Sequence, residues 1–288
     1  MKKRSERLPH RVVALAYDQL CTFELGCVIE VFGLKRPEIR GPWYDFSVCA
    51  VDKGRMRATG GLTLRAPYDM ALLRNADTII IPGWRDLEQA PPRALVQQLI
   101  RAHQRGARLA SICSGAFLLA ATGLLRGHAA TTHWKYASAL AQRYPDIDVQ
   151  PNALYVSADA GRLLSSAGSA AGLDMMLHLI RSDHGSQVAN LVAQRLVIPP
   201  LRDGGQAQFV PRPVAKDTGH QEGTRLAKLM EWVRAHPAQA HSLASMAKRA
   251  ILSPRSLQRK FLEATGLTPI AWVVTQRIAF ARELLETS

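Results

Sequence analysis

The hydrophobic positions of the first two hundred residues form short continuous runs that alternate with segments of helical periodicity. Runs such as Arg11–Ala16 and Arg108–Ile112 are mostly apolar after their first residue, which is typical of strands buried within a parallel sheet. The predicted strands are 11–16, 46–51, 78–81, 108–112, 154–157 and 163–165, and the predicted helices are 24–32, 94–105 and 171–184. This alternation predicts a doubly wound, flavodoxin-like α/β domain, and the turn at Asp159-Ala160-Gly161 predicts a hairpin between the last two strands.

The pattern changes after Pro199-Pro200. Residues 204–224 are rich in Gly, Pro and polar side chains and show no sustained periodicity, which indicates an interdomain linker. The remainder of the chain has helical periodicity only. We therefore expect an α/β domain at 10–203, a linker at 204–224 and an all-α region at 225–288.

Two short helices joined by a tight turn are predicted in the all-α region. The first covers Leu243–Ala250, and the second covers Pro254–Thr265. Ser253 is a favoured N-cap residue and is followed by proline at the first helical position, while Gly266 is suited to the position just after the helix. Two helices in this arrangement predict a helix-turn-helix.

The second of these helices has one apolar and one polar stripe. Leu257 and Phe261 lie on the apolar stripe, and Arg255, Gln258 and Arg259 share the opposite one. Arginine can pair with guanine and glutamine with adenine through two hydrogen bonds each. Further predicted DNA contacts, to phosphates among others, are Lys248, Arg249, Ser256 and Lys260. The alternative interpretation is a surface helix with a solvated basic face.

Composition adds modest support for a nucleic-acid partner. The formal net charge is +14, and the hydrophobic fraction of 47 % excludes disorder along the whole length. The four cysteines form no Cys-x-x-Cys pair, and no apolar run approaches the length of a membrane helix. We expect a cytoplasmic protein without a metal or cofactor. The alternative interpretation of the positive charge is that many soluble proteins are simply basic.

One cysteine occupies a chemically distinctive position. Cys113 follows the strand Arg108–Ile112 and precedes small residues that begin a helix, which predicts a nucleophile elbow at the carboxyl edge of the sheet. The helix N-terminus is expected to favour its thiolate. The alternative is an inert, buried cysteine.

The carboxyl-terminal pattern L-x-x-M-A-x-x-A-x-x-S-P-R-S-L-Q-R-x-F-x-x-x-x-G-x-x-P, which begins at Leu243, resembles the AraC family of transcription regulators. The resemblance implies that Arg255, Gln258 and Arg259 form the base-reading face. It also implies that residues 271–285 are the helix linking two helix-turn-helix units. Ile251 departs from the small residue usual in the turn, and the sequence ends at Ser288, where the second unit would begin. The expected DNA-binding region is therefore truncated.

The amino-terminal part resembles the PfpI-like (class I glutamine amidotransferase-like) sensor domains of AraC regulators, in their FtrA- and GlxA-like subgroup. The motifs are F-E-L-G-x-x-x-E-V-F-G (23–33), P-G-W (82–84), S-I-C-S-G-A-F-L-L-A-x-x-G-L-L (111–125), A-T-T-H-W (130–134), S-S-A-G-S-A-A-G-L-D (165–174) and P-P-L-R-D-G-G-Q-A-Q-F (199–209). The resemblance implies a pocket that binds a small metabolite without turning it over. Its predicted lining is Glu24, Trp84, Cys113, Ser114, His133 and Trp134.

The aromatic faces of Trp84 and Trp134 suit cationic nitrogen, unless both are ordinary packing residues. We expect a ligand-responsive, homodimeric DNA-binding regulator that does not catalyse a reaction. RNA polymerase is a further expected partner if the protein activates transcription. One alternative is a cysteine hydrolase or hydratase with a DNA-tethering tail, in which Cys113 attacks, His133 is the base and Glu24 is the acid. Another is a truncated product that senses or dimerises without holding an operator.

Overall fold

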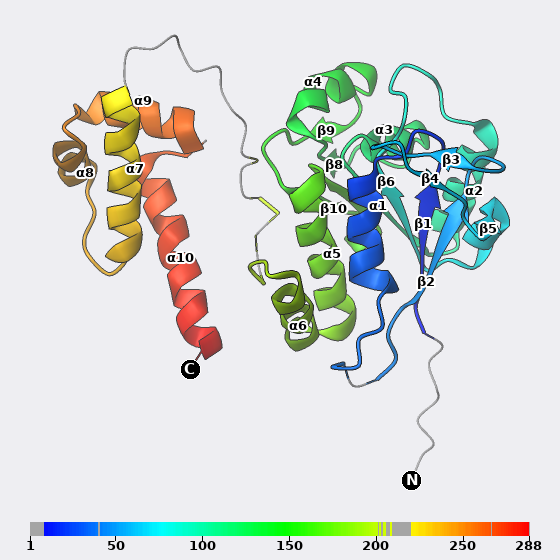
Figure 1. The fold of residues 1–288 in the computed structure, drawn as a ribbon. Coiled ribbons are helices and arrows are strands. Elements are labelled where there is room, and N and C mark those ends of the chain that lie inside the picture. Colours follow the sequence, from blue (N-terminus) through cyan, green and yellow to red (C-terminus); the bar gives the residue numbers. More distant parts are fainter. Residues whose placement is uncertain are drawn as a thin grey trace. The chain divides into compact units, whose positions relative to one another are not determined.

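The structure is a computed structural model that describes residues 9–39, 41–200, 202, 204, 205, 208, 220–265 and 267–287, without the side chains of 220–224, 279 and 282–287. The chain separates into two compact units, Met1–Gln208 and Phe209–Ser288, and each is described by itself (Figure 1). Most of the predicted linker, and the predicted helix-ending Gly266, lie outside the described residues.

A seven-stranded sheet in the order β10-β11-β7-β6-β1-β2-β5 forms the centre of the N-terminal unit. All neighbours pair in parallel except β10 and β11, which form the predicted hairpin. The strands are β1 (Arg11–Ala16), β2 (Asp45–Ala50), β5 (Tyr68–Asp69), β6 (Thr78–Pro82), β7 (Arg108–Ile112), β10 (Tyr155–Ala158) and β11 (Leu163–Ser166). The sheet is therefore mixed, with one antiparallel edge strand on a parallel core.

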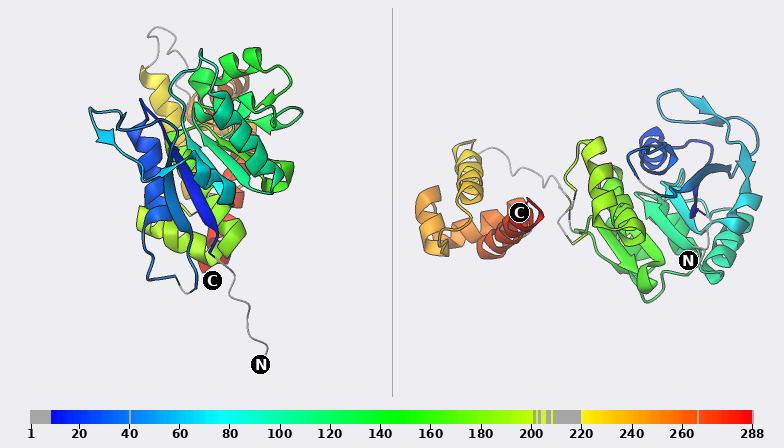
Figure 2. Two further views of the ribbon diagram at one scale, coloured as in Figure 1. Left: turned by 90° about the vertical axis from the view of Figure 1, so that its right-hand side faces the viewer. Right: turned by 90° about the horizontal axis from the view of Figure 1, so that it is seen from below.

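Helices cover both faces of this sheet. From β1 to β2 the chain moves one way across the sheet, and from β6 to β7 it moves the other way, so right-handed crossovers place α1 and α2 on opposite faces. Helices α1 and α5 pack side by side (Figures 1 and 2). The helices are α1 (Thr22–Val28), η1 (Ile29–Gly33), η2 (Met70–Asn75), α2 (Arg93–Gln104), α3 (Gly115–Ala121), α4 (Trp134–Arg143), η3 (Asp159–Gly161), α5 (Ser169–His184) and α6 (Ser186–Leu196).

Four further strands form two small two-stranded sheets outside the main one. They are β3 (Met56–Arg57), β4 (Thr63–Leu64), β8 (Ala129–Ala130) and β9 (Asp148–Val149). Each contains only two residues, which is too short for a hydrophobic period to show in the sequence.

The first predicted helix differs from the observed one at both ends. It begins at Thr22 rather than Glu24, and its last turn, Ile29–Gly33, is a π-helix. A side chain at Gly33 would bring its Cβ to 2.9 Å from Cδ1 of Phe46 on β2. The π-helical turn thus ends at Gly33, where the helix backbone lies directly against β2. Helical periodicity in the sequence does not reveal this contact.

The C-terminal unit consists of α7 (His220–Ala235), α8 (Leu243–Ala250), α9 (Pro254–Thr265) and α10 (Pro269–Thr287). The bounds of α8 and α9 are those predicted. Oγ of Ser253 accepts a hydrogen bond from the backbone N of Ser256 at 3.1 Å, which caps α9 as expected. The buried core of this unit is Leu226, Leu229, Val233, Met246, Ala247, Ala250, Leu257, Phe261, Trp272 and Val273.

In the residues that the structure describes, no helix is both long enough and apolar enough to cross a membrane.

Candidate functional site

The elbow at Cys113 is built as a strained turn between β7 and α3. Cys113 has a φ of +55°, in the left-handed region that non-glycine residues rarely occupy, and its backbone N donates to O of Ser166 on β11 at 3.0 Å. A Cβ at Gly115 would lie 2.5 Å from O of Ile81, and one at Gly168 would lie 3.1 Å from Sγ of Cys113. Two glycines thus allow the neighbouring strand and loop to close around the cysteine.

Glu24 projects from α1 beside this elbow and is nearly fully buried, with 5 % of its surface exposed. Cys21 lies beside its carboxylate, and the Glu24 charge acts on both Cys21 and Cys113. Oε2 of Glu24 has no hydrogen-bond partner among the described residues. A buried carboxylate oxygen without a donor is costly, so this atom is suited to receive a donor or a cation from outside the chain.

The Cys113 thiol has a raised pKa, whereas the sequence predicted a thiolate. Burial and then the negative charge of Glu24 raise its pKa from about 9 to about 12. The backbone N–H of Ser114 at the helix start acts in the opposite direction but is outweighed. The expectation of a thiolate favoured by the helix is therefore wrong, because desolvation and the adjacent carboxylate both disfavour a second negative charge.

Ser114 and Trp84 fasten two loops together at the carboxyl edge of the sheet. Oγ of Ser114 accepts from the backbone N of Trp84 at 2.8 Å and donates to its carbonyl oxygen at 3.0 Å. The Trp84 ring packs against Tyr17 with centroids 4.9 Å apart, and only 6 % of Trp84 is exposed. The hydroxyl of Tyr17 donates to O of Pro82 at 2.8 Å. Trp84 is thus mainly a packing residue.

His133 and Trp134 stand at the start of α4. Nδ1 of His133 accepts from the backbone N of Lys135 at 3.3 Å and caps the helix. Burial and the charge of Lys135 lower the His133 pKa, so the ring is neutral at neutral pH. The Trp134 ring is 41 % exposed and lies 5.3 Å from the His133 ring. Within the described part of the chain, no hydrogen bond joins Cys113 to His133, whose Nδ1 lone pair is already engaged.

Two residues that the sequence reasoning did not single out complete this region. Oγ1 of Thr132, fully buried, donates to O of Cys113 at 2.8 Å. Gln208 accepts from the backbone N of Trp134 at 3.0 Å and donates to O of Thr132 at 3.0 Å. Both lie in quoted motifs, A-T-T-H-W and P-P-L-R-D-G-G-Q-A-Q-F, but a motif gives no partner for an individual side chain.

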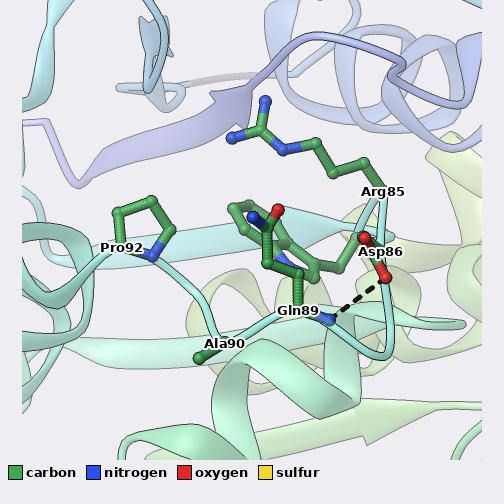
Figure 3. Close-up of a pocket in the computed structure, with 6 residues that line it drawn as sticks. Arg85, Asp86, Gln89, Ala90 and Pro92 are labelled. Carbon is green, nitrogen blue, oxygen red and sulfur yellow. Dashed lines mark hydrogen bonds between the residues drawn. The ribbon is translucent and has the colours of Figure 1, made fainter.

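Two surface hollows, of about 340 and 390 Å³, lie along the loop that follows β6. Figure 3 shows the first, in which the Gln89 backbone N donates to the Asp86 carboxylate within this loop. Of the six predicted pocket residues, Trp84 alone lines these hollows. The Arg85 guanidinium is already paired with Asp52. Neither Glu24 nor Cys113 lines either hollow. In the described residues, no group of three or more His, Cys, Asp or Glu could hold a metal ion.

The predicted DNA-contacting residues lie on α8 and α9 of the C-terminal unit. Leu257 and Phe261 are fully buried, whereas Arg255, Gln258 and Arg259 on the opposite stripe are exposed. Lys248 and Arg249 are also exposed, Ser256 and Lys260 are half-buried, and the Ser256 hydroxyl accepts from Oγ of Ser253 at 2.9 Å. The Arg249 guanidinium lies 4.0 Å from the centroid of the Trp232 ring on α7, which holds it in a cation–π contact.

The sequence of this chain is similar to those of transcriptional regulators and of one enzyme. The chain is 25 % identical to the HTH-type transcriptional regulator GbdR of Pseudomonas aeruginosa over 283 residues, which cover 97 % of this chain and 75 % of that protein. It is 32 % identical to an isonitrile hydratase of Pseudomonas putida over 144 residues, covering 49 % of this chain and 61 % of the hydratase.

The fold of the N-terminal unit has solved counterparts. An AraC family transcriptional regulator from Pseudomonas putida superposes with a TM-score of 0.54 and 22 % identity, over 65 % of this chain and 100 % of that one. The model of the DJ-1/PfpI family matches residues 10–182, which is more than half of the chain. The chain therefore belongs to the DJ-1/PfpI family.

Proposed function

We propose that this chain is a DNA-binding transcriptional regulator whose N-terminal unit binds a small effector. The observation that carries the proposal is the division of α9 into two stripes. Leu257 and Phe261 anchor it in the core of its unit, and Arg255, Gln258 and Arg259 are left exposed on the other side. The near-complete alignment with a transcriptional regulator supports this interpretation, because it covers both units.

The pairing of α8 with α9 has the features of a helix-turn-helix. Ile251 ends α8 with a φ of +56°, and the chain then enters α9 through the Ser253 cap. The tight turn depends on this left-handed residue, and Ile251 is 69 % exposed there. In this proposal α9 is the recognition helix, and Lys248 and Arg249, both exposed at the end of α8, contact phosphates.

The effector site of this proposal is the elbow region around Glu24 and Cys113. Glu24 offers a buried carboxylate oxygen that lacks a donor, and Trp134 adds a partly exposed aromatic face. A carboxylate and an aromatic face both attract positive charge. The effector class is therefore a small molecule with a cationic nitrogen. We also propose a homodimer, the commonest closed assembly, formed through the N-terminal units.

The elbow also raises a second candidate, a hydratase-like enzyme, because 144 residues of this chain are 32 % identical to an isonitrile hydratase. The strained φ of Cys113 favours it. Against it, the raised pKa of Cys113 keeps the thiol protonated, and His133 Nδ1 caps a helix instead of accepting a proton from sulfur. We therefore assign Cys113 to ligand contact rather than to nucleophilic attack.

A binding experiment on the full chain tests the regulator proposal. An operator is first selected from a random-sequence duplex pool and then titrated in a mobility-shift assay. Arg259→Ala should weaken specific binding by about 1–3 kcal/mol, because one bidentate base contact is lost. Lys228→Ala, which removes another exposed positive charge, on α7, is the matched control and should have little effect. Equal affinities for the two variants, or a pool from which no sequence is enriched, would contradict the proposal.

A further inference from the structure

Trp232 on α7 packs against the core of the C-terminal unit but is only half-buried. The guanidinium of Arg249, at the end of α8, lies over the ring of Trp232, with its central carbon 4.0 Å from the ring centroid. At this distance the two groups are in contact, and the negative face of the indole attracts the positive charge of the arginine. An aromatic ring on one helix therefore holds an exposed cation of the next helix.

The loop between α7 and α8 holds the Trp232 ring in place. The ring of His241 lies nearly perpendicular to the indole, with centroids 5.0 Å apart, and Nδ1 of His236 donates to the carbonyl oxygen of Trp232 at 2.9 Å. Nε2 of His241 donates to O of His236 at 2.8 Å. Arg277 on α10 donates to two carbonyl oxygens of the same loop and so fastens it to a third helix. The indole ring is therefore fixed from several sides.

The hydrogen-bond donors of Arg249 remain available. A guanidinium that contacts a ring through its face keeps its N–H groups, which lie in its own plane, free to bind another group. Among the residues that the structure describes, no hydrogen bond or ion pair engages the Arg249 side chain. Two other arginines of this unit differ, because Arg234 donates to Gln276 and Arg277 donates to the loop between α7 and α8. Arg249 thus combines a fixed position with unused donors.

Such a guanidinium suits a phosphate of the DNA backbone. Its planar N–H groups match two phosphate oxygens at once. Ordering a flexible side chain on binding costs free energy, so an arginine that is already held in place binds more tightly than a free one. The neighbouring Lys248 is exposed, and in the described part of the chain it has no ring contact of this kind. Of these two cations, Arg249 is therefore the one prepared for a directed contact.

We propose that Trp232 is a positioning residue that holds Arg249 ready to bind a DNA phosphate, outside the recognition helix. This inference rests on the proposed function, since it specifies how the C-terminal unit would grip the DNA backbone. Trp232 acts only through the position of the Arg249 guanidinium and does not itself contact the DNA. A phosphate contact carries no sequence information, so Trp232 and Arg249 should contribute equally to an operator and to unrelated DNA.

The salt dependence of binding tests the phosphate contact on the full chain. Two duplexes of equal length, the selected operator and one of unrelated sequence, are titrated by fluorescence anisotropy between about 50 and 200 mM salt. Arg249→Ala should reduce the slope of log K against log salt concentration by about 0.9, the value for one phosphate contact. It should weaken binding to both duplexes about tenfold. Arg101→Ala, which removes an exposed arginine from α2 of the N-terminal unit, is the matched control and should leave the slope unchanged.

A double-mutant cycle tests the role of Trp232. Trp232→Leu removes no charge, yet it should weaken binding to both duplexes about two- to fivefold, the factor that corresponds to an exposed cation–π contact. In the Arg249→Ala background the same substitution should have no effect, because no guanidinium is left to position. In the Lys248→Ala background it should keep its full effect. Trp232→Phe retains an aromatic face and should restore most of the affinity of the parent.

The inference is overturned if Trp232→Leu weakens binding by the same factor with and without Arg249, which is the result expected for a role in folding alone. It is also overturned if Arg249→Ala leaves the salt slope unchanged, or if Arg101→Ala lowers that slope by as much. Each variant must retain the helical circular dichroism of the parent. Should Trp232→Leu fail to do so, the same cycle with Trp232→Met, which keeps an apolar contact without a ring, gives the decision.

Failure of this inference is distinct from failure of the regulator proposal. If the parent chain binds neither duplex, the regulator proposal fails and this inference fails with it. If the parent binds the operator but the cycle shows no coupling between Trp232 and Arg249, only this inference fails.

Discussion

Replacing Gly168 with alanine should damage the elbow by two separable effects. Gly168 precedes α5 with φ +109° and ψ 168°, a conformation that is essentially restricted to glycine and that costs other residues about 1–3 kcal/mol. The new methyl group would also lie 2.9 Å from Cβ and 3.1 Å from Sγ of Cys113. Such overpacking adds about 1–3 kcal/mol. The total loss in the free energy of unfolding is then about 2–6 kcal/mol.

The other end of the same helix offers a matched control. Gly185 has φ +87° and ψ 170°, and a Cβ there would meet nothing within 4 Å. Gly185→Ala therefore carries the backbone strain without the collision. Urea unfolding of the two variants, followed by circular dichroism, should show Gly168→Ala to be less stable than Gly185→Ala by about 1–3 kcal/mol.

A second readout locates the effect at the site. Gly168→Ala should change the rate at which iodoacetamide labels Cys113, whereas Gly185→Ala should not. If the two variants were equally stable and labelled Cys113 at equal rates, Gly168 would not be pressed against the cysteine. The close approach of Gly168 to Cys113, on which this prediction rests, would then be wrong.

Two further predictions concern the pocket itself. Burial and Glu24 raise the pKa of Cys113 to about 12, so the thiol stays protonated through neutral pH. The rate at which iodoacetamide labels Cys113, measured by peptide mass spectrometry, should therefore still rise about tenfold per pH unit up to pH 10. A plateau of that rate near pH 8 would refute the raised pKa. In a thermal-shift screen of the full chain, a saturating quaternary ammonium or guanidinium compound should stabilise by about 3 kcal/mol at one hundred times its Kd, because it binds only the folded state. Glu24→Gln should abolish this shift, and an equal shift in that variant would remove Glu24 from the site.

Much of the fold was accessible from the sequence because it depends on local patterns. The bounds of β1, β7, α8 and α9 follow from apolar runs, from helical spacing and from the Ser253-Pro254 start signal, and the structure confirms them. The turn at Cys113 was predicted for the same reason, since a strand, a reactive residue and small neighbours follow one another directly in the chain. By contrast, two-residue strands such as β8 and β9 contain no full period that a pattern could reveal.

The chemistry of the site was decided by tertiary structure. The pKa of Cys113 depends on how deeply the sheet and helices bury it and on the charge that α1 brings beside it, and the sequence suggested the opposite direction. His133 was predicted to lie in the pocket, yet only the fold shows that its Nδ1 caps α4. Gln208 belongs to a motif, but its partners on the segment from Thr132 to Trp134 are distant in the chain. Desolvation and hydrogen bonding act between groups that meet only on folding, so a linear pattern can identify such residues without showing what they do.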